Sequence, residues 1–139
     1  MKKLLLVATV IVVAFTATTC NKVTENNIQG TWEYAGQHNR YVEQVPNSSK
    51  DIDWDWVCSA PDIKESDRFV LIFYNNGTCR MGGVDGRLGD YSIKGDILVV
   101  QGQSYYAKFK EKDLFMVAYS VLANSKIAED ASRCIRLSK

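Results

Sequence analysis

Residues 68–81 read RFVLIFYNNGTCRM, and this stretch carries the clearest structural signal in the chain. Residues 68–74 are rich in β-branched and aromatic side chains, which is typical of a β-strand. The Asn-Asn-Gly sequence at 75–77 supplies residues that accept the positive backbone angles of a tight hairpin turn. Residues 78–81 are therefore expected to return as an antiparallel strand.

The same pattern of short strand-like segments and tight turns continues from Gly30 to the end of the chain, with almost no helical periodicity. Residues 95–96 and 111–113 have the length of hairpin connections. We therefore predict an all-β fold, an eight-stranded antiparallel up-and-down (meander) barrel. A barrel of this size either fills its interior with side chains or holds one small ligand. The expected strands are residues 31–36, 68–74, 78–81, 89–94, 97–101, 104–110, 114–119 and 133–137.

Consecutive connections in such a meander fall at opposite ends of the barrel. The three tight turns share one end, which we expect to be closed. The long loops gather at the other end, which we expect to be an open mouth where a ligand or partner binds. One of them is expected to hold a short helix near residues 124–131. The connections at the mouth are residues 37–67, 82–88, 102–103 and 120–132.

The N-terminus has the features of a bacterial export signal. Lys2 and Lys3 precede an apolar run at residues 4–15, which is short for a membrane span and leads through small residues to Cys20. Residues 17–20 resemble the lipobox of bacterial lipoproteins, which implies a signal peptide at 1–19 and a palmitate-type lipid on Cys20. This lipid would anchor the protein to the outer membrane of a bacterial cell envelope. The alternative is an ordinary secretory signal with Cys20 left as a free or paired thiol.

The remaining chain divides into a short polar tether at residues 20–27 and one domain at residues 28–139. Of the 17 lysines and arginines, Lys2 and Lys3 fall in the signal, which leaves 15 against 16 acidic side chains. This near balance gives no electrostatic footprint for nucleic acid. We therefore assign the membrane contact to the lipid alone and expect no nucleic-acid partner.

Two short segments resemble the lipocalin-like, calycin-type barrel domains of bacterial surface lipoproteins. The Gly-Thr-Trp sequence at 30–32 matches the Gly-x-Trp motif that opens the first lipocalin strand, and Ile-Arg-Leu at 135–137 matches the closing strand. The resemblance implies that Trp32 and Arg136 cap the closed end of the barrel through a cation–π contact. The alternative for Trp32 is an ordinary core position. Alternation that turns the two aliphatic residues of 135–137 inward would turn Arg136 outward.

Three cysteines remain in an oxidising compartment once Cys20 is lipidated. Cys58 lies in the long mouth segment and Cys134 begins the last strand at the same end, whereas Cys79 follows the hairpin turn at the closed end. We therefore predict a Cys58–Cys134 disulfide that pins the mouth segment, with Cys79 as a buried free thiol.

The mouth segment contains the sequence DIDWDW at residues 51–56. In an extended chain its carboxylates face one way and its indoles, Trp54 and Trp56, face the other. We predict that the indoles form a lid or a stacking surface at the mouth, with Tyr34 and His38 among the ligand-binding residues. An anchor in a protein interface suits the indoles equally well. A calcium loop is disfavoured because Trp56 stands where the loop needs Gly, and no metal site is expected.

Catalytic signatures are weak in this chain. His38 is the only histidine, and neither a nucleophile motif nor a phosphate-binding glycine loop accompanies it. We expect no enzyme activity and no cofactor. The sequence favours a membrane-anchored, lipocalin-like lipoprotein that binds a small apolar or amphipathic ligand at the open end of the barrel. The alternative is a protein-binding module, an inhibitor or scaffold of a cell-envelope complex, with a filled barrel core.

Overall fold

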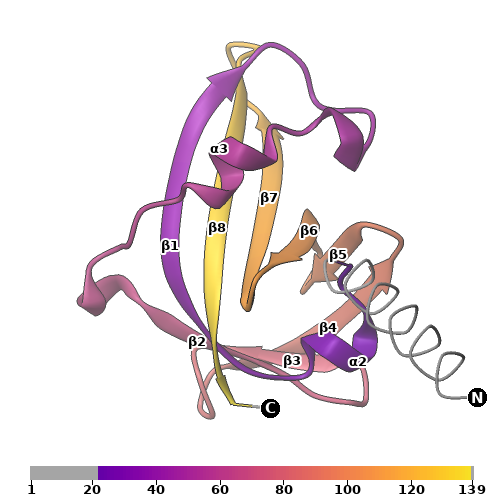
Figure 1. Cartoon of the computed structure of the whole chain (residues 1–139), viewed down its shortest axis with the longest axis vertical. Coiled ribbons are helices and arrows are strands. Elements are labelled where there is room, and N and C mark those ends of the chain that lie inside the picture. The colour runs from indigo at the N-terminus through magenta and orange to yellow at the C-terminus, as the bar shows by residue number, and fades with distance from the viewer. Residues whose placement is uncertain (1–21, 139) are drawn as a thin grey trace, which may run out of the picture.

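The computed structural model describes residues 22–138, so the predicted signal peptide and Cys20 lie outside the described residues. The chain is mostly β. Each of its eight antiparallel strands pairs with its neighbours in sequence, and the first pairs with the last, so that the sheet closes into a ring (Figure 1). The strands are β1 (Gly30–Val42), β2 (Phe69–Phe73), β3 (Thr78–Met81), β4 (Arg87–Lys94), β5 (Ile97–Val100), β6 (Gln103–Lys110), β7 (Asp113–Val121) and β8 (Ile127–Ser138).

The predicted antiparallel strands and their hairpin turns are confirmed. The β2–β3, β4–β5 and β6–β7 turns lie at one end of the ring, together with the start of β1 and the end of β8. We call this the closed end. The other four connections, which include the long one between β1 and β2, leave from the opposite, open end.

Two strands, β1 and β8, are much longer than the sequence predicts, and β7 extends slightly beyond its predicted range. β1 continues to Val42, and β8 begins at Ile127, so that β1, β8 and β7 form a tall wall that rises beyond the shorter strands (Figure 1). The helix expected near residues 124–131 is therefore wrong. The chain turns tightly between Leu122 and Lys126, and strand pairing on both sides of β8 satisfies the backbone groups that a helix would have paired internally.

The closed end is covered by a short helix, α2 (Glu25–Ile28), in the region expected to be a polar tether. Thr24 caps this helix, and its side chain and that of Asn27 exchange hydrogen bonds with each other's backbone. Val23 is 3% exposed and Ile28 is fully buried against the core of the ring. The tether prediction is therefore wrong for residues 23–27, because two aliphatic side chains that flank a polar run are enough to dock it.

Trp32 and Arg136 lie together at the closed end, opposite each other across the β1–β8 pairing. The Arg136 guanidinium lies 4.1 Å from the centre of the Trp32 ring. It also donates to the carbonyls of Gln29, at 2.8 Å, and Asn27, at 2.5 Å, while the Trp32 indole donates to the Ile28 carbonyl. Arg136 thus ties the end of α2 to the last strand.

The lower half of the ring interior, next to the closed end, is packed with side chains. Trp32 stacks on Phe109 with ring centres 5.8 Å apart, and Phe73 meets Tyr91 edge-on. The other buried residues of this core include Ile28, Leu71, Cys79, Leu98, Leu114 and Cys134.

The long connection between β1 and β2 runs down the outer face of the wall. It contains a 3₁₀ turn at Ser49–Asp51, the helix α3 (Trp54–Cys58) and a second 3₁₀ turn at Glu65–Asp67. Helix α3 lies across the outside of β7 and β8 (Figure 1). A second apolar cluster forms there from Ile52, Val57, Phe115, Val117 and Ala131. Phe115 and Val117 of β7 are therefore buried on the outer face of the wall, while Leu114 and Met116 of the same strand face the ring interior.

Replacing Arg136 by lysine tests the lock at the closed end. Arg136→Lys keeps the charge but loses the planar fork that reaches two carbonyls and the indole, so we expect the free energy of unfolding to fall by about 1–3 kcal/mol. Urea denaturation measures the loss. The matched variant Arg87→Lys, at an exposed position on β4, should change stability by less than about 0.5 kcal/mol. Equal effects of the two variants would contradict a structural role for Arg136.

Candidate binding pocket

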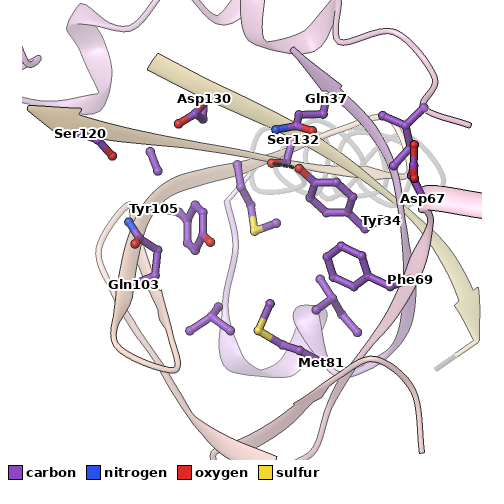
Figure 2. Close-up of a pocket in the computed structure, with 15 residues that line it drawn as sticks. Tyr34, Gln37, Asp67, Phe69, Met81, Gln103, Tyr105, Ser120, Asp130 and Ser132 are labelled. Atoms are coloured by element: carbon purple, nitrogen blue, oxygen red, sulfur yellow. Dashed lines mark hydrogen bonds between the residues drawn. The ribbon is translucent and has the colours of Figure 1, made fainter. Parts of the chain in front are cut away.

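The upper half of the ring interior holds a cavity of about 530 Å³ that opens at the open end (Figure 2). This volume falls within the range of small-molecule sites in proteins, roughly 300–1,000 Å³. Side chains from most strands of the ring and from the segment before β2 contribute to it. The lining residues are Tyr34, Gln37, Ile63, Asp67, Phe69, Leu71, Met81, Val100, Gln103, Tyr105, Met116, Ala118, Ser120, Asp130 and Ser132.

The wall presents its pocket residues in rows that follow the strand register. Cys134 of β8 lies between Tyr34 and Leu114, and Ser132 lies between Gln37 and Met116. One row nearer the opening, Asp130 lies beside Ala118 of β7. The pocket therefore becomes more polar from its base to its opening.

The base of the pocket is apolar and aromatic. The Tyr34 and Phe69 rings stack with centres 4.6 Å apart and planes 15° apart. Leu71, Met81 and Met116 line the cavity below and beside this pair. Methionine side chains adapt to differently shaped apolar groups, so this base suits the apolar part of a small ligand.

Two phenols and one hydroxyl give the pocket fixed polar groups. The Ser132 hydroxyl donates to the Tyr34 hydroxyl at 3.1 Å (Figure 2). Burial raises the pKa of both Tyr34 and Tyr105 above its ordinary value, and at Tyr34 this outweighs the opposing effect of the Ser132 hydrogen bond. Both phenols are therefore protonated at neutral pH, and each can donate a hydrogen bond to a ligand.

Of the four residues predicted at the mouth, Tyr34 lines the pocket and the other three lie elsewhere. The register between β1 and β8 shifts between Tyr34 and Gly36, which leaves Ala35 as an extra residue. This bulge reverses the alternation, so that Gln37 points inward and His38 outward. Unbroken alternation would have put His38 on the same face as Tyr34.

Trp54 and Trp56 also lie on the outer face, so the predicted lid is wrong. The two indoles belong to the apolar cluster that packs α3 on the wall. Trp56 stacks on His38 with ring centres 4.0 Å apart, and the Arg40 guanidinium lies 4.0 Å from the Trp56 ring. Trp56 lies on His38 of β1, and the Lys108 ammonium of β6 lies 4.8 Å from the Trp54 ring, so both indoles are held on the outer face.

A buried carboxylate organises the polar contacts beside this cluster. Glu129 accepts from Arg40 at 2.6 Å and from the Tyr119 hydroxyl at 2.5 Å, and Arg40 also reaches Asp53 at 3.6 Å. Burial and the contact with Glu129 raise the pKa of Tyr119 far above its ordinary value. These contacts fix α3 to the strands β1, β7 and β8.

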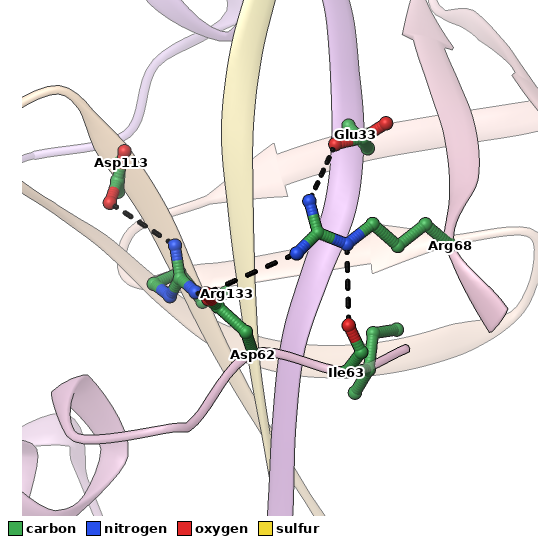
Figure 3. Close-up of polar contacts among 6 residues, drawn as sticks. All are labelled: Glu33, Asp62, Ile63, Arg68, Asp113 and Arg133. Atoms are coloured by element: carbon green, nitrogen blue, oxygen red, sulfur yellow. Dashed lines mark hydrogen bonds and ion pairs between the residues drawn. The ribbon is translucent and has the colours of Figure 1, made fainter. Parts of the chain in front are cut away.

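The segment before β2 is clamped to the wall by two arginines (Figure 3). Arg133 pairs with Asp62 and lies 3.8 Å from Asp113. Arg68 pairs with Glu33 at 3.2 Å and donates to the Ile63 carbonyl at 3.4 Å.

A close backbone approach completes this clamp. Gly36 bridges to Asp62, and a Cβ at Gly36 would lie 3.0 Å from the Pro61 carbonyl oxygen, so glycine lets the segment cross the strand. The crossing brings Ile63 and Asp67 to the pocket.

The predicted Cys58–Cys134 disulfide is wrong, since both residues are free thiols, as is Cys79. Cys134 is fully buried inside the ring beside Leu114, whereas Cys58 lies in α3 on the outer face. The sheet therefore separates the two sulfurs. Cys134 and Arg136 face the interior, whereas the prediction of the disulfide required Ile135 and Leu137 to face inward. Burial raises the pKa of the Cys134 thiol to about 12.

The acidic residues of the DIDWDW sequence serve the local fold. Asp53 caps α3 by accepting from the Trp56 backbone, and the carboxylates at 51, 53 and 55 are exposed opposite the packed indoles. Asp62, which follows this sequence, pairs with Arg133. Across residues 22–138, no group of three or more histidine, cysteine or acidic side chains is placed to hold a metal ion.

Searches of protein-family models, of curated proteins and of solved structures find no match to this chain. A function for this protein must therefore be inferred from the geometry of its pocket. Within residues 22–138, no helix has both the length and the apolar character that crossing a bilayer requires.

Several pocket residues are absent from the sequence prediction. Phe69, Met81 and Tyr105 lie on strands that were identified correctly, so alternation from Tyr34 across the ring could have found them. Asp130 was missed because it fell in the expected helix. Gln37 was missed because the bulge at Ala35 reverses the alternation after Tyr34.

Thiol labelling tests the positions of the three cysteines. In the native protein, iodoacetamide should modify half-buried Cys58 and leave buried Cys79 and Cys134 unmodified, whereas all three should react in urea. Peptide mass spectrometry after digestion separates these sites from Cys20. In the native Cys58→Ser variant, neither Cys79 nor Cys134 should be labelled. A peptide pair joined through Cys58 and Cys134 would contradict the structure.

Proposed function

We propose that this protein is a non-catalytic carrier that binds one small amphipathic ligand in the cavity at the open end of its ring of strands. The observation that carries the proposal is the gradient in the pocket, from an apolar base at Phe69, Leu71 and Met81 to a polar opening at Gln37, Gln103 and Asp130. An amphipathic molecule matches this gradient when its apolar part enters first.

We further propose that the domain is lipocalin-like and is carried as a lipoprotein of the bacterial cell envelope, anchored through Cys20. The contact between Trp32 and Arg136 at the closed end supports the first part, because the Gly-x-Trp resemblance implied that pairing. The export signal and the cysteine that ends it support the second part.

The residues of the pocket support binding rather than catalysis. His38, the only histidine of the chain, lies on the outer face against Trp56, so the sheet separates its ring from the cavity. Among the described lining residues, the hydroxyls of Ser132 and Ser120 have no histidine or lysine to act as their general base.

A protein-binding role is the second candidate, and the tip of the wall supports it. Tyr41 is 63% exposed and Leu122 is 38% exposed, and both border a small groove of about 170 Å³ above the pocket. Exposed aromatic and aliphatic side chains at one edge are typical of a protein interface. This role needs no ligand in the cavity.

Filling the cavity tests the carrier function. Residues 20–139, the proposed mature chain, hold the whole described fold, and the neutral dye Nile red serves as the probe. Ala118 is buried and borders the cavity, so Ala118→Phe should place a ring in the empty space and weaken dye binding on the order of tenfold or more. The matched control Ala123→Phe, in the exposed turn between β7 and β8, should leave dye affinity unchanged.

Circular dichroism should show that both variants keep the fold. Wild-type affinity in a folded Ala118→Phe protein would place the dye outside the cavity and contradict the carrier function. Failure of the wild-type protein to bind the dye would favour the protein-binding role.

A further inference from the structure

The opening of the pocket is acidic. Two carboxylates, Asp67 and Asp130, line the cavity, and among the described lining residues there is no lysine, arginine or histidine. The opening is therefore negative, although the chain as a whole has a net charge of only +1.

Asp130 lacks the arginine partner that the neighbouring acidic residues have. Glu33, Asp62, Asp113 and Glu129 each lie within 4.0 Å of an arginine nitrogen. No such ion pair forms at Asp130 anywhere in residues 22–138, and Figure 2 draws no contact from its carboxylate to another lining residue. Glu129 and Asp130 are adjacent on β8 and point to opposite faces of the sheet. Glu129 pairs with Arg40, whereas Asp130 has no such partner.

Aromatic faces lie below this carboxylate. Tyr34 and Phe69 stack in the pocket, and Tyr105 lines its other side (Figure 2). The charge of Asp130 also contributes to the raised pKa values of Tyr34 and Tyr105, after the larger effect of burial. A cation at this level would be attracted by the carboxylate and by the electron-rich ring faces together.

We infer that the natural ligand joins an apolar body to a cationic nitrogen, such as an ammonium group, that pairs with Asp130. This inference rests on the proposed carrier function and names the chemical class of its ligand. An amphiphile that ends in a carboxylate would meet like charge at the opening, and no described basic side chain of the pocket could pair with it. Fatty acids are therefore disfavoured.

Three ligands with the same ten-carbon chain test the inference. Decylammonium, decanol and decanoate each displace Nile red from residues 20–139 at pH 7.5, below their micelle concentrations. We expect decylammonium to bind about tenfold more tightly than decanol, since a charge-assisted contact replaces a neutral one, and decanoate to bind most weakly.

Removing the charge of Asp130 should abolish this order. Asp130→Asn keeps the side-chain size, so decanol affinity should stay within about twofold of wild type while decylammonium loses about tenfold. The matched control Asp85→Asn, at an exposed position between β3 and β4, should keep the wild-type order. Circular dichroism checks that both variants are folded.

The outcomes separate the inference from the function on which it rests. Equal affinities for all three ligands, or an Asp130→Asn protein that keeps the preference for decylammonium, would overturn the cationic-ligand inference and leave the carrier function standing. If neither Nile red nor any of the three ligands binds the wild-type protein, both are overturned.

Discussion

The pairing of β1 with β8 is the constraint on which the rest of the structure depends. It closes the sheet, and through its register it decides which side chains enter the ring. The extra residue at Ala35 divides the pairing into two parts with different alternation. Below it Trp32 and Arg136 seal the closed end, and above it Gln37 and Ser132 face the cavity.

The wall formed by β1, β7 and β8 is stabilised from outside, which leaves its inner face free for the pocket. Helix α3 covers Phe115 and Val117 on the outer face, and the Arg68 and Arg133 clamp holds the following segment. Burial of apolar surface stabilises the folded state by roughly 25 cal/mol per Å². The packing of α3 on the outer face can therefore hold the long strands in place without side chains that fill the ring. The interior is packed only near the closed end, where Trp32, Phe73 and Leu98 lie.

The hairpins could be predicted from the sequence because their turns have local chemical signals, such as the Asn-Asn-Gly at 75–77. The wall was predicted only in part. Residues 114–119 were identified as a strand, whereas residues 37–42 and 127–132 were assigned to loops because neither stretch has a long run of β-branched and aromatic side chains. The disulfide and lid predictions failed because each required knowing which face of the wall a residue occupies. The place of Cys134 depends on the register of β8, and that of His38 depends on a bulge without a sequence signature. Tyr34 was predicted as a site residue from the sequence, whereas Asp130 could be placed in the pocket only once the fold was known.

Under the proposed lipid anchor at Cys20, the place where the described chain begins decides which end of the ring faces the bilayer. Lys22 and Asp96, which is in the β4–β5 turn at the closed end, line the same surface pocket. An acyl chain on Cys20, two residues before Lys22 in the sequence, would hold the closed end against the leaflet and direct the opening into the aqueous compartment. Cargo would then be exchanged with water or with a facing partner, and not drawn sideways from the membrane that carries the anchor.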